Sequence, residues 1–152
     1  MNEALFRRIR PWLLATDVGM LLYWTLTAAF AVGLVDLPAE LLFSDYDNPV
    51  VTSWNWSFLP LDIAFSVSGL GAALLFRVGR SGWQLLTLAS LFLTFCAGLM
   101  AISFWAVRCE FDPVWWVLNG VLIAWPLWFL RDLARAMSLA DASVEGDSDD
   151  AV

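Results

Sequence analysis

Four long apolar stretches, separated by short polar segments, divide the chain at residues 11–35, 57–76, 83–107 and 114–130. Each has a length in the range of about 17–25 residues that a helix needs to cross the hydrocarbon core of a bilayer. The polar segments that separate and flank them are 1–10, 36–56, 77–82, 108–113 and 131–152. The pattern predicts an all-α polytopic membrane protein, built as a four-helix transmembrane bundle.

The longest internal polar segment, 36–56, contains acidic residues but no arginine or lysine. Within it we expect a short interfacial helix over 37–43 and a turn over 45–49, because an Asn-Pro pair favours turn initiation. Trp54 and Trp56 suit the headgroup level, where tryptophan is enriched. We therefore expect this segment to be an acidic loop, on the outer side of the membrane according to the distribution of arginine described below. The acidic segment 131–152 is predicted to be a disordered tail.

Composition supports a membrane location and excludes several classes of function. The chain is 61% hydrophobic and 15% charged, with a mean hydropathy of +0.72, whereas soluble domains are about 25% charged. The net charge is −7, and all eight basic residues are arginine, with no histidine in the chain. Histidine chemistry is thereby excluded, no basic patch indicates nucleic acid, and no catalytic motif, metal ligand set or cofactor is predicted.

The arginines also predict an orientation. Seven of the eight lie in 1–10, 77–82 and 131–152, and only Arg108 lies in the remaining polar segments. Short loops that are rich in arginine stay in the cytoplasm. We therefore expect a multi-pass protein of the cell (inner or plasma) membrane with both termini in the cytoplasm.

Two carboxylates inside the apolar stretches are the leading candidates for a functional site, since intramembrane acids are costly and rare. Asp17 is interpreted either as a proton or cation site or as a structural partner of an arginine that reaches inward, namely Arg10, Arg77 or Arg131. Asp62 lies about five residues inside the outer end of its helix, level with Arg108. For these two we expect a charge-assisted hydrogen bond, and the alternative is a protonatable functional carboxylate.

Other polar residues complete the candidate site. Asn119, inside the fourth stretch, is expected to form a hydrogen bond across the bundle. Asp45, Asp47 and Asn55 lie with Trp54 and Trp56 in or beside the outer loop. The segment 45–48 lacks the glycine and terminal glutamate of an EF-hand loop, so no metal is predicted.

Small and polar residues form one face on each of two predicted helices. These are Asp62, Ser66, Gly69 and Ala73 on the second helix, and Thr87, Ser90, Thr94, Gly98 and Ala101 on the third. Small faces let membrane helices approach closely, so we expect the two to pack together. Cys96 and Cys109, about 20 Å apart on a continuous helix, are too distant for a disulfide.

The chain contains a Trp-Asn-Trp-Ser run at 54–57, together with Asp-Val-Gly-Met at 17–20, Tyr-Trp at 23–24, Asp-Tyr-Asp-Asn-Pro at 45–49 and Ser-Gly-Leu at 68–70. These segments resemble the YvaD-like family of small bacterial membrane proteins. The resemblance covers roughly residues 11–130, and its specific part is the run at 54–57. It implies a four-helix membrane protein and supplies no activity.

Function is predicted only as a class. The leading hypothesis is a non-enzymatic membrane protein that binds a small ligand, a lipid or a partner in the outer half of the bundle. The alternative is a proton-coupled small-molecule transporter that uses Asp17 and Asp62, and a membrane enzyme is the third. Partners are the lipid bilayer and either further copies of the chain or another membrane protein.

Overall fold

A computed structural model describes the backbone of residues 1–149, and side chains as far as Arg135 apart from that of Glu40. Within that part the chain is helical. Four helical stretches are long and apolar enough to cross a membrane, at Glu3–Ala31, Pro49–Arg77, Trp83–Val107 and Pro113–Arg135. This confirms the predicted all-α class. The elements are α1 (Glu3–Ala31), η1 (Ala39–Leu41), α2 (Pro49–Ser57), α3 (Leu59–Arg77), α4 (Trp83–Val107) and α5 (Pro113–Asp149).

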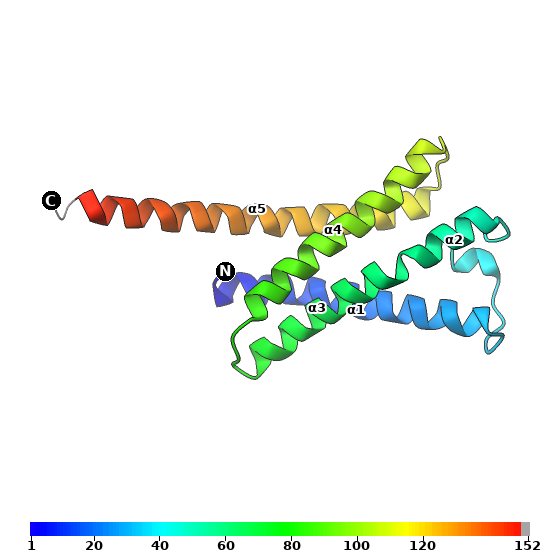
Figure 1. Ribbon diagram of the computed structural model, residues 1–152, viewed down its shortest axis with the longest axis horizontal. Coiled ribbons are helices and arrows are strands. Elements are labelled where there is room, and N and C mark those ends of the chain that lie inside the picture. Colours follow the sequence, from blue (N-terminus) through cyan, green and yellow to red (C-terminus); the bar gives the residue numbers. More distant parts are fainter. Residues whose placement is uncertain (150–152) are drawn as a thin grey trace.

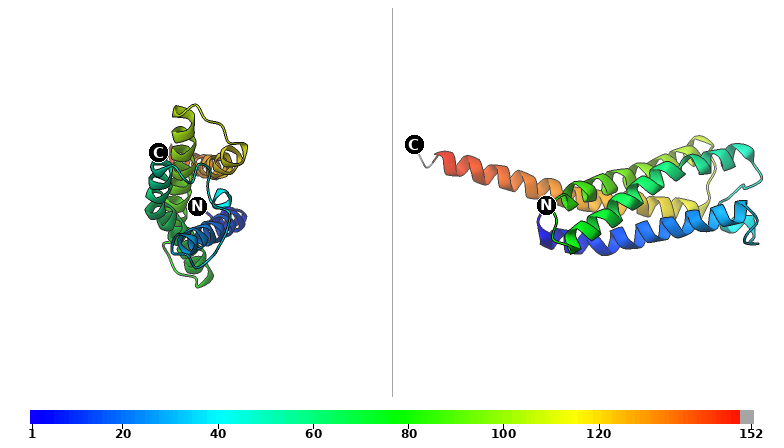
Figure 2. Two further views of the ribbon diagram at one scale, coloured as in Figure 1. Left: turned by 90° about the vertical axis from the view of Figure 1, so that its right-hand side faces the viewer. Right: turned by 60° about the horizontal axis from the view of Figure 1, so that its bottom comes forward.

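The helices pack in an order that leaves α1 and α5 largely apart. Helices α3 and α4 form an antiparallel hairpin, α1 packs on α3, and α5 packs on α4 (Figures 1 and 2). Between α1 and α5, Trp12 and Trp125 stack with their ring centroids 6.2 Å apart. Farther along the bundle, residues of both helices instead face a cavity.

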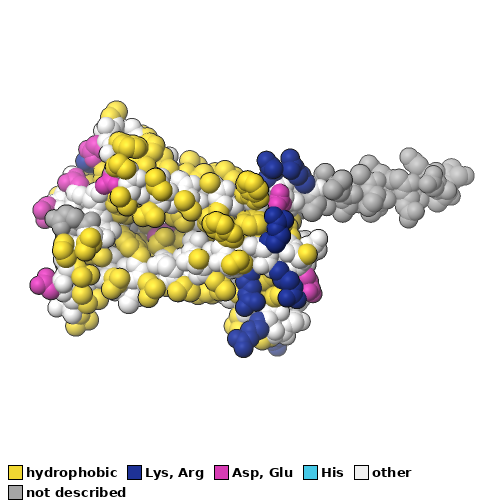
Figure 3. Space-filling view, turned by 180° about the vertical axis from the view of Figure 1, so that it is seen from behind, with side chains coloured by type: hydrophobic (Ala, Val, Ile, Leu, Met, Phe, Trp, Pro, Cys, Tyr) yellow, Lys and Arg dark blue, Asp and Glu magenta, His cyan; other side chains and the backbone are white. Residues whose placement is uncertain are grey.

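The two ends of the bundle carry opposite charge. We call one the arginine end and the other, which holds η1, α2 and residues 108–113, the loop end. Figure 3 shows the basic side chains gathered at one end of an apolar surface, with a few acidic side chains beside them, and further acidic side chains at the other end. The residues that define the arginine end are Arg7, Arg8, Arg10, Arg77, Arg80, Arg131 and Arg135.

Three groups of buried apolar side chains hold the bundle together. The first, around Phe6, Ile9 and Trp125, joins α1, α3, α4 and α5 at the arginine end. The second surrounds Phe65 in the middle of the bundle, and the third surrounds Phe43 at the loop end. The third group attaches the segment before α2 to the helices, which positions the loop over the cavity.

The outer loop differs from its prediction because it contains helices. The predicted interfacial helix over 37–43 is the single 3₁₀ turn η1. Residues 49–56, predicted as loop, lie in α2, which begins at Pro49 and is capped by Asn48 through a 3.0 Å bond from the Val50 N–H. An Asx cap followed by proline at the first helical position is a strong helix start. Only one residue, Phe58, separates α2 from α3.

The acidic tail also differs from its prediction, because α5 continues to Asp149. Residues 134–145 contain neither proline nor glycine and are rich in alanine, leucine and other good helix formers. That local propensity extends the helix beyond the end of the bundle (Figure 1). The last three predicted tail residues, 150–152, lie outside the described residues.

Candidate functional site: a cavity and two buried carboxylates

A cavity of about 670 Å³ lies between α1 and α5 in the loop-end half of the bundle. Its walls come from all four long helices and from η1, and a hollow opens in the apolar surface between the helices (Figure 3). The volume lies within the range of about 300–1,000 Å³ that is usual for ligand pockets. Its few polar residues are Tyr23, Ser44, Asn55, Asp62, Asp112, Asn119 and Thr16.

Asp62 is the carboxylate in the wall of this cavity and is only 4% exposed. Its Oδ2 accepts a 2.9 Å hydrogen bond from the indole N–H of Trp24 on α1. Its Oδ1 is buried and has no partner in the described part of the chain. One oxygen of the carboxylate is therefore fixed across the α1–α3 contact, and the other is buried without a hydrogen-bond partner.

Asp17 lies deeper in the bundle, where α1, α3 and α4 meet, and is fully buried (0% exposed). It fills the space left by Gly69: a Cβ added there would lie 1.9 Å from Asp17 Oδ2 and 2.9 Å from Ser90 Oγ. Neither carboxylate oxygen has a hydrogen-bond partner among the described residues. None of the ion pairs among the described residues includes Asp17, so it is not paired with Arg10, Arg77 or Arg131, the partners that the sequence suggested.

Unpaired hydroxyl groups lie at the level of Asp17 and between that level and Asp62. Ser66, Ser90 and Thr94 are all fully buried, and their hydroxyl oxygens have no partner in the described structure. Ser66 is one turn from Asp62 along α3, and Thr94 is one turn from Ser90 along α4. These hydroxyls and the two acids form a buried polar strip through the α1–α3–α4 contact.

The Trp-Asn-Trp segment of α2 lies beside the cavity and holds α2 against α1. Asn55 accepts a 2.9 Å hydrogen bond from the hydroxyl of Tyr23. Trp54 lines the cavity and stacks on Phe104 of α4, with ring centroids 4.2 Å apart. Trp56 packs at 5.4 Å on the same Trp24 ring that donates to the carboxylate. The structure thus brings the predicted residues Trp54, Asn55 and Trp56 into the surroundings of the cavity.

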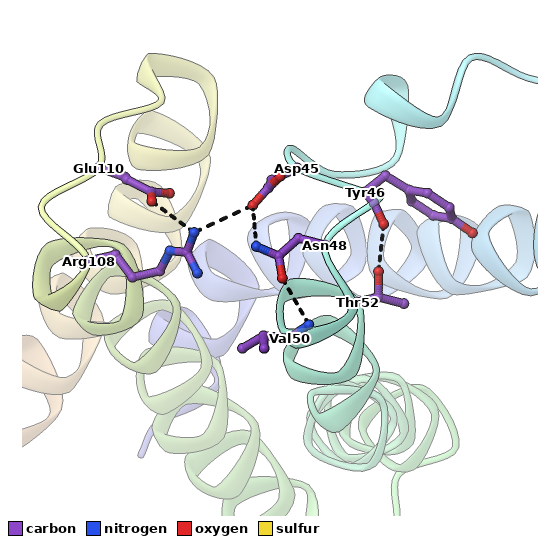
Figure 4. A network of polar contacts seen from close by, with 7 residues as sticks. All are labelled: Asp45, Tyr46, Asn48, Val50, Thr52, Arg108 and Glu110. Carbon is purple, nitrogen blue, oxygen red and sulfur yellow. Dashed lines mark hydrogen bonds and ion pairs between the residues drawn. The ribbon is translucent and has the colours of Figure 1, made fainter.

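The predicted pair between Asp62 and Arg108 is wrong. Arg108 donates to Glu110 at 2.8 Å and lies 3.5 Å from Asp45 (Figure 4). Asp62 instead accepts its hydrogen bond from Trp24. The Glu110 hydrogen bond, with the nearby charge of Asp45, raises the pKa of Arg108. Helix rise placed the two predicted partners at one level but said nothing of direction. Arg108 instead points to Asp45 and Glu110 at the loop end. All three side chains are partly exposed there, so the desolvation cost of an ion pair is small.

Asp45 has a structural role in the turn before α2. Its carboxylate also accepts a 2.8 Å bond from Asn48, the residue that caps α2 (Figure 4). Asp47, another predicted site residue, is exposed and lies beside this network rather than in the cavity. No group of three His, Cys, Asp or Glu side chains among the described residues is placed to hold a metal ion.

Asp112 at the rim ties the loop to the start of α5. Ser44 donates to one of its carboxylate oxygens, and the N–H groups of Val114 and Trp115 donate to the other. These hydrogen bonds, chiefly that of Ser44, lower the pKa of Asp112. The contact fixes the position of the loop over the cavity.

Two further predictions are corrected. The amide of Asn119, expected to bond across the bundle, donates to the Trp115 carbonyl of its own helix at 2.9 Å, although the residue does line the cavity. Gly98, predicted to pack against the second apolar helix, faces α5 instead, since a Cβ there would lie 2.7 Å from the Asn119 carbonyl. The rest of the two small faces is buried as expected. Cys96 and Cys109 are free thiols.

Trp24 and Tyr23 were not predicted as site residues. The available signal was helical spacing: Trp24 follows Asp17 by seven residues, which is two turns along one face. Ser66, Ser90 and Thr94 were also not predicted as site residues, because their pattern was explained by packing alone.

The fold and the cavity define a small all-helical protein with four helices that are long and apolar enough to span a membrane. The chain belongs to a family of unknown function (DUF5360), whose model matches residues 9–139. It is 45% identical over 129 residues to the protein of Bacillus subtilis (strain 168) described as "Uncharacterized protein YvaD", covering 85% of this chain and 93% of that one. This confirms the resemblance seen in the sequence. No solved structure matches the chain.

Proposed function

We propose that the four long helices cross the cell membrane with the arginine end, and therefore both termini, in the cytoplasm. The proposal is supported by the distribution of charge, with seven arginines at one end and Arg108 at the other, because arginine-rich short segments are retained on the cytoplasmic side. In this orientation the cavity lies in the outer half of the bundle.

The function that the geometry supports best is non-enzymatic binding of a small, largely apolar molecule that carries a cationic or hydrogen-bond-donating group. The observation that carries this proposal is that Asp62, a residue in the wall of an apolar cavity, has one carboxylate oxygen buried without a partner among the described residues. A buried carboxylate is costly unless it is paired. An ammonium group on the ligand would supply the partner, and the apolar walls would bind the remainder of the molecule.

A matched pair of probes tests this proposal. We expect 4-phenylbutylamine to bind the purified protein about tenfold or more tightly than 4-phenylbutanol, since a hydrogen bond to a charged group contributes about 1.5–3 kcal/mol. Asp62→Asn should abolish that preference for the amine. Asp36→Asn, which removes an exposed loop acid, should retain it. Equal binding of the two probes by the wild-type protein would reject the proposal.

Proton-coupled transport is a second candidate, supported by a separate observation. Asp17 is fully buried without a partner among the described residues, the unpaired hydroxyl of Ser90 lies at its level beside Gly69, and those of Ser66 and Thr94 lie one turn nearer the loop end. Because Asp17 contacts Gly69, seven residues along α3 from Asp62, the helical rise separates the two levels by about 10 Å. Transport would require water or side-chain rotation to join these hydroxyls into a hydrogen-bonded chain between the two carboxylates.

Proton flux into proteoliposomes separates transport from binding. A transporter should show ligand-dependent proton uptake with the 4-phenylbutylamine probe, and both Asp17→Asn and Asp62→Asn should abolish it. Asp36→Asn is again the control. If flux is absent while Asp62-dependent binding of the amine persists, binding alone is the function.

A further inference from the structure

A second pocket, of about 590 Å³, lies at the arginine end, between the start of α1 and the turn that joins α3 to α4. We call it the arginine pocket. Its walls and floor are made by Arg7, Arg10, Arg77, Arg80, Phe76 and Trp83. It lies at the opposite end of the bundle from the cavity that contains Asp62.

Local backbone structure brings these arginines together from separate segments. Arg7 and Arg10 are three residues apart on α1 and so lie on one side of that helix. The end of α3 is a Schellman motif, with the Gly79 N–H bonded to the Phe76 carbonyl and the Arg80 N–H bonded to the Leu75 carbonyl. Gly79 has φ +67°, which lets the chain turn back so that Arg80 joins Arg77 at the pocket.

The charges of the pocket are poorly balanced. Its one acidic residue, Glu3, lies 3.6 Å from Arg7, and both of these side chains are largely exposed. Arg10, Arg77 and Arg80 have no acidic partner in the part of the chain that the structure describes. The Nε–H of Arg10 is also buried there without a hydrogen-bond acceptor. Four guanidinium groups and one carboxylate therefore meet around an open volume.

The floor is apolar and aromatic. Phe76 and Trp83 pack edge-on with ring centroids 5.2 Å apart, and Arg7 lies 5.3 Å over the Phe76 ring. Helix α4 begins at Trp83, and no side chain caps its N-terminus. The positive end of its dipole adds to the charge of the pocket.

We propose that the arginine pocket binds a phosphate group. Guanidinium groups bind phosphate oxygens by paired, charge-assisted hydrogen bonds, and basic pockets between membrane helices on the cytoplasmic side are suited to anionic headgroups. The aromatic floor would contact the glycerol or the first part of the acyl chains. Two sources share this chemistry: an anionic phospholipid and a soluble phosphate ester.

A pair of variants with equal charge tests the site. Arg77→Gln/Arg80→Gln removes two charges from the pocket, and Arg131→Gln/Arg135→Gln removes two charges of the same end that do not line it. Melting temperatures are measured in neutral detergent with added dioleoylphosphatidylglycerol, dioleoylphosphatidylcholine or glycerol 1-phosphate. Ligand that binds only the folded protein raises its melting temperature.

We expect phosphatidylglycerol to stabilise the wild-type protein and the Arg131→Gln/Arg135→Gln control more than phosphatidylcholine does. The apparent affinity of the pocket variant should fall about tenfold or more. A shift with phosphatidylglycerol alone identifies a lipid headgroup, and a shift with glycerol 1-phosphate as well identifies a soluble ester. Equal losses in the two variants, or no shift of the wild type with either anion, would overturn the proposal. If the double variant does not fold, Arg80→Gln in the exposed turn replaces it.

Discussion

The contact between Gly69 and Asp17 can be tested by adding a single methyl group. In Gly69→Ala the new Cβ would lie 1.9 Å from Asp17 Oδ2, whereas ordinary contacts of a Cβ begin near 3.4 Å. The carboxylate would therefore have to retreat by about 1.5 Å within a fully buried three-helix contact. Ser90 Oγ, at 2.9 Å, would also have to rotate away.

The size of the effect follows from two opposing contributions. Overfilling a packed core costs about 1–3 kcal/mol, and replacing glycine by alanine inside a helix contributes about 0.5–1 kcal/mol in the other direction. We therefore expect Gly69→Ala to lower the free energy of unfolding by about 1–2 kcal/mol. Gly120→Ala is the control, since a Cβ there meets nothing within 4 Å, and it should be neutral or stabilising.

A double-mutant cycle assigns the loss to Asp17. In an Asp17→Ala background the obstructing carboxylate is gone, so Gly69→Ala should be neutral or should stabilise by up to about 1 kcal/mol. The two changes should thus be coupled by about 1–3 kcal/mol in unfolding measurements in detergent. Equal effects of Gly69→Ala in both backgrounds would refute the placement of Asp17 against Gly69.

Three further predictions address the hydrogen bond to Asp62, the orientation and the loop contact. Trp24→Phe removes the only bond to that carboxylate seen in the described structure, so it should destabilise by about 1–3 kcal/mol more than its change in packing. Single cysteines are placed at Asp47 or Ser81 in a cysteine-free background. In intact cells a membrane-impermeant thiol reagent should label the cysteine at Asp47, and it should label the cysteine at Ser81 only after the membrane is opened. Between its folded and unfolded pKa, Asp112 binds more protons in the unfolded chain, since folding lowers that pKa. Its contribution to stability is therefore lost as the pH falls below about 4.

Each of these has a control and a contradicting result. Trp105→Phe removes an indole N–H that has no partner in the described residues, so an equal loss in the two tryptophan variants would argue against the Trp24 bond. Reversed labelling at Asp47 and Ser81 would reject the orientation. For Asp112→Asn, the melting temperature should fall less steeply with acid than that of the wild type, and identical slopes would reject the role of that carboxylate.

The long helices were predictable from sequence because each corresponds to a long apolar stretch, and short charged segments separate these stretches. The start of α2 could also have been found, since Asn48 and Pro49 are a cap and a first helical residue. It was missed because the same Asn-Pro pair favours a turn. Local sequence alone did not distinguish an isolated turn from the first turn of a helix.

The partners of the buried acids were less predictable. Depth along a helix placed Asp62 and Arg108 at one level, but the direction of each side chain depends on how the helices rotate about their axes. That rotation is set by packing between residues far apart in sequence, such as Trp24 with the α3 carboxylate and Asp17 with Gly69. An unpaired acid in apolar sequence predicts that a site exists, and only the packed structure indicates what the acid meets.

The opening between α1 and α5 affects how any ligand of the cavity would be measured. In the proposed membrane arrangement that opening would face lipid, and the bilayer would be the reservoir from which the cavity is filled. Occupancy then depends on the concentration of the ligand in one leaflet, which is its aqueous concentration multiplied by its partition coefficient. An apparent dissociation constant would change with the ratio of lipid to protein. A weakly soluble amphiphile could saturate the cavity at an aqueous concentration far below its intrinsic dissociation constant.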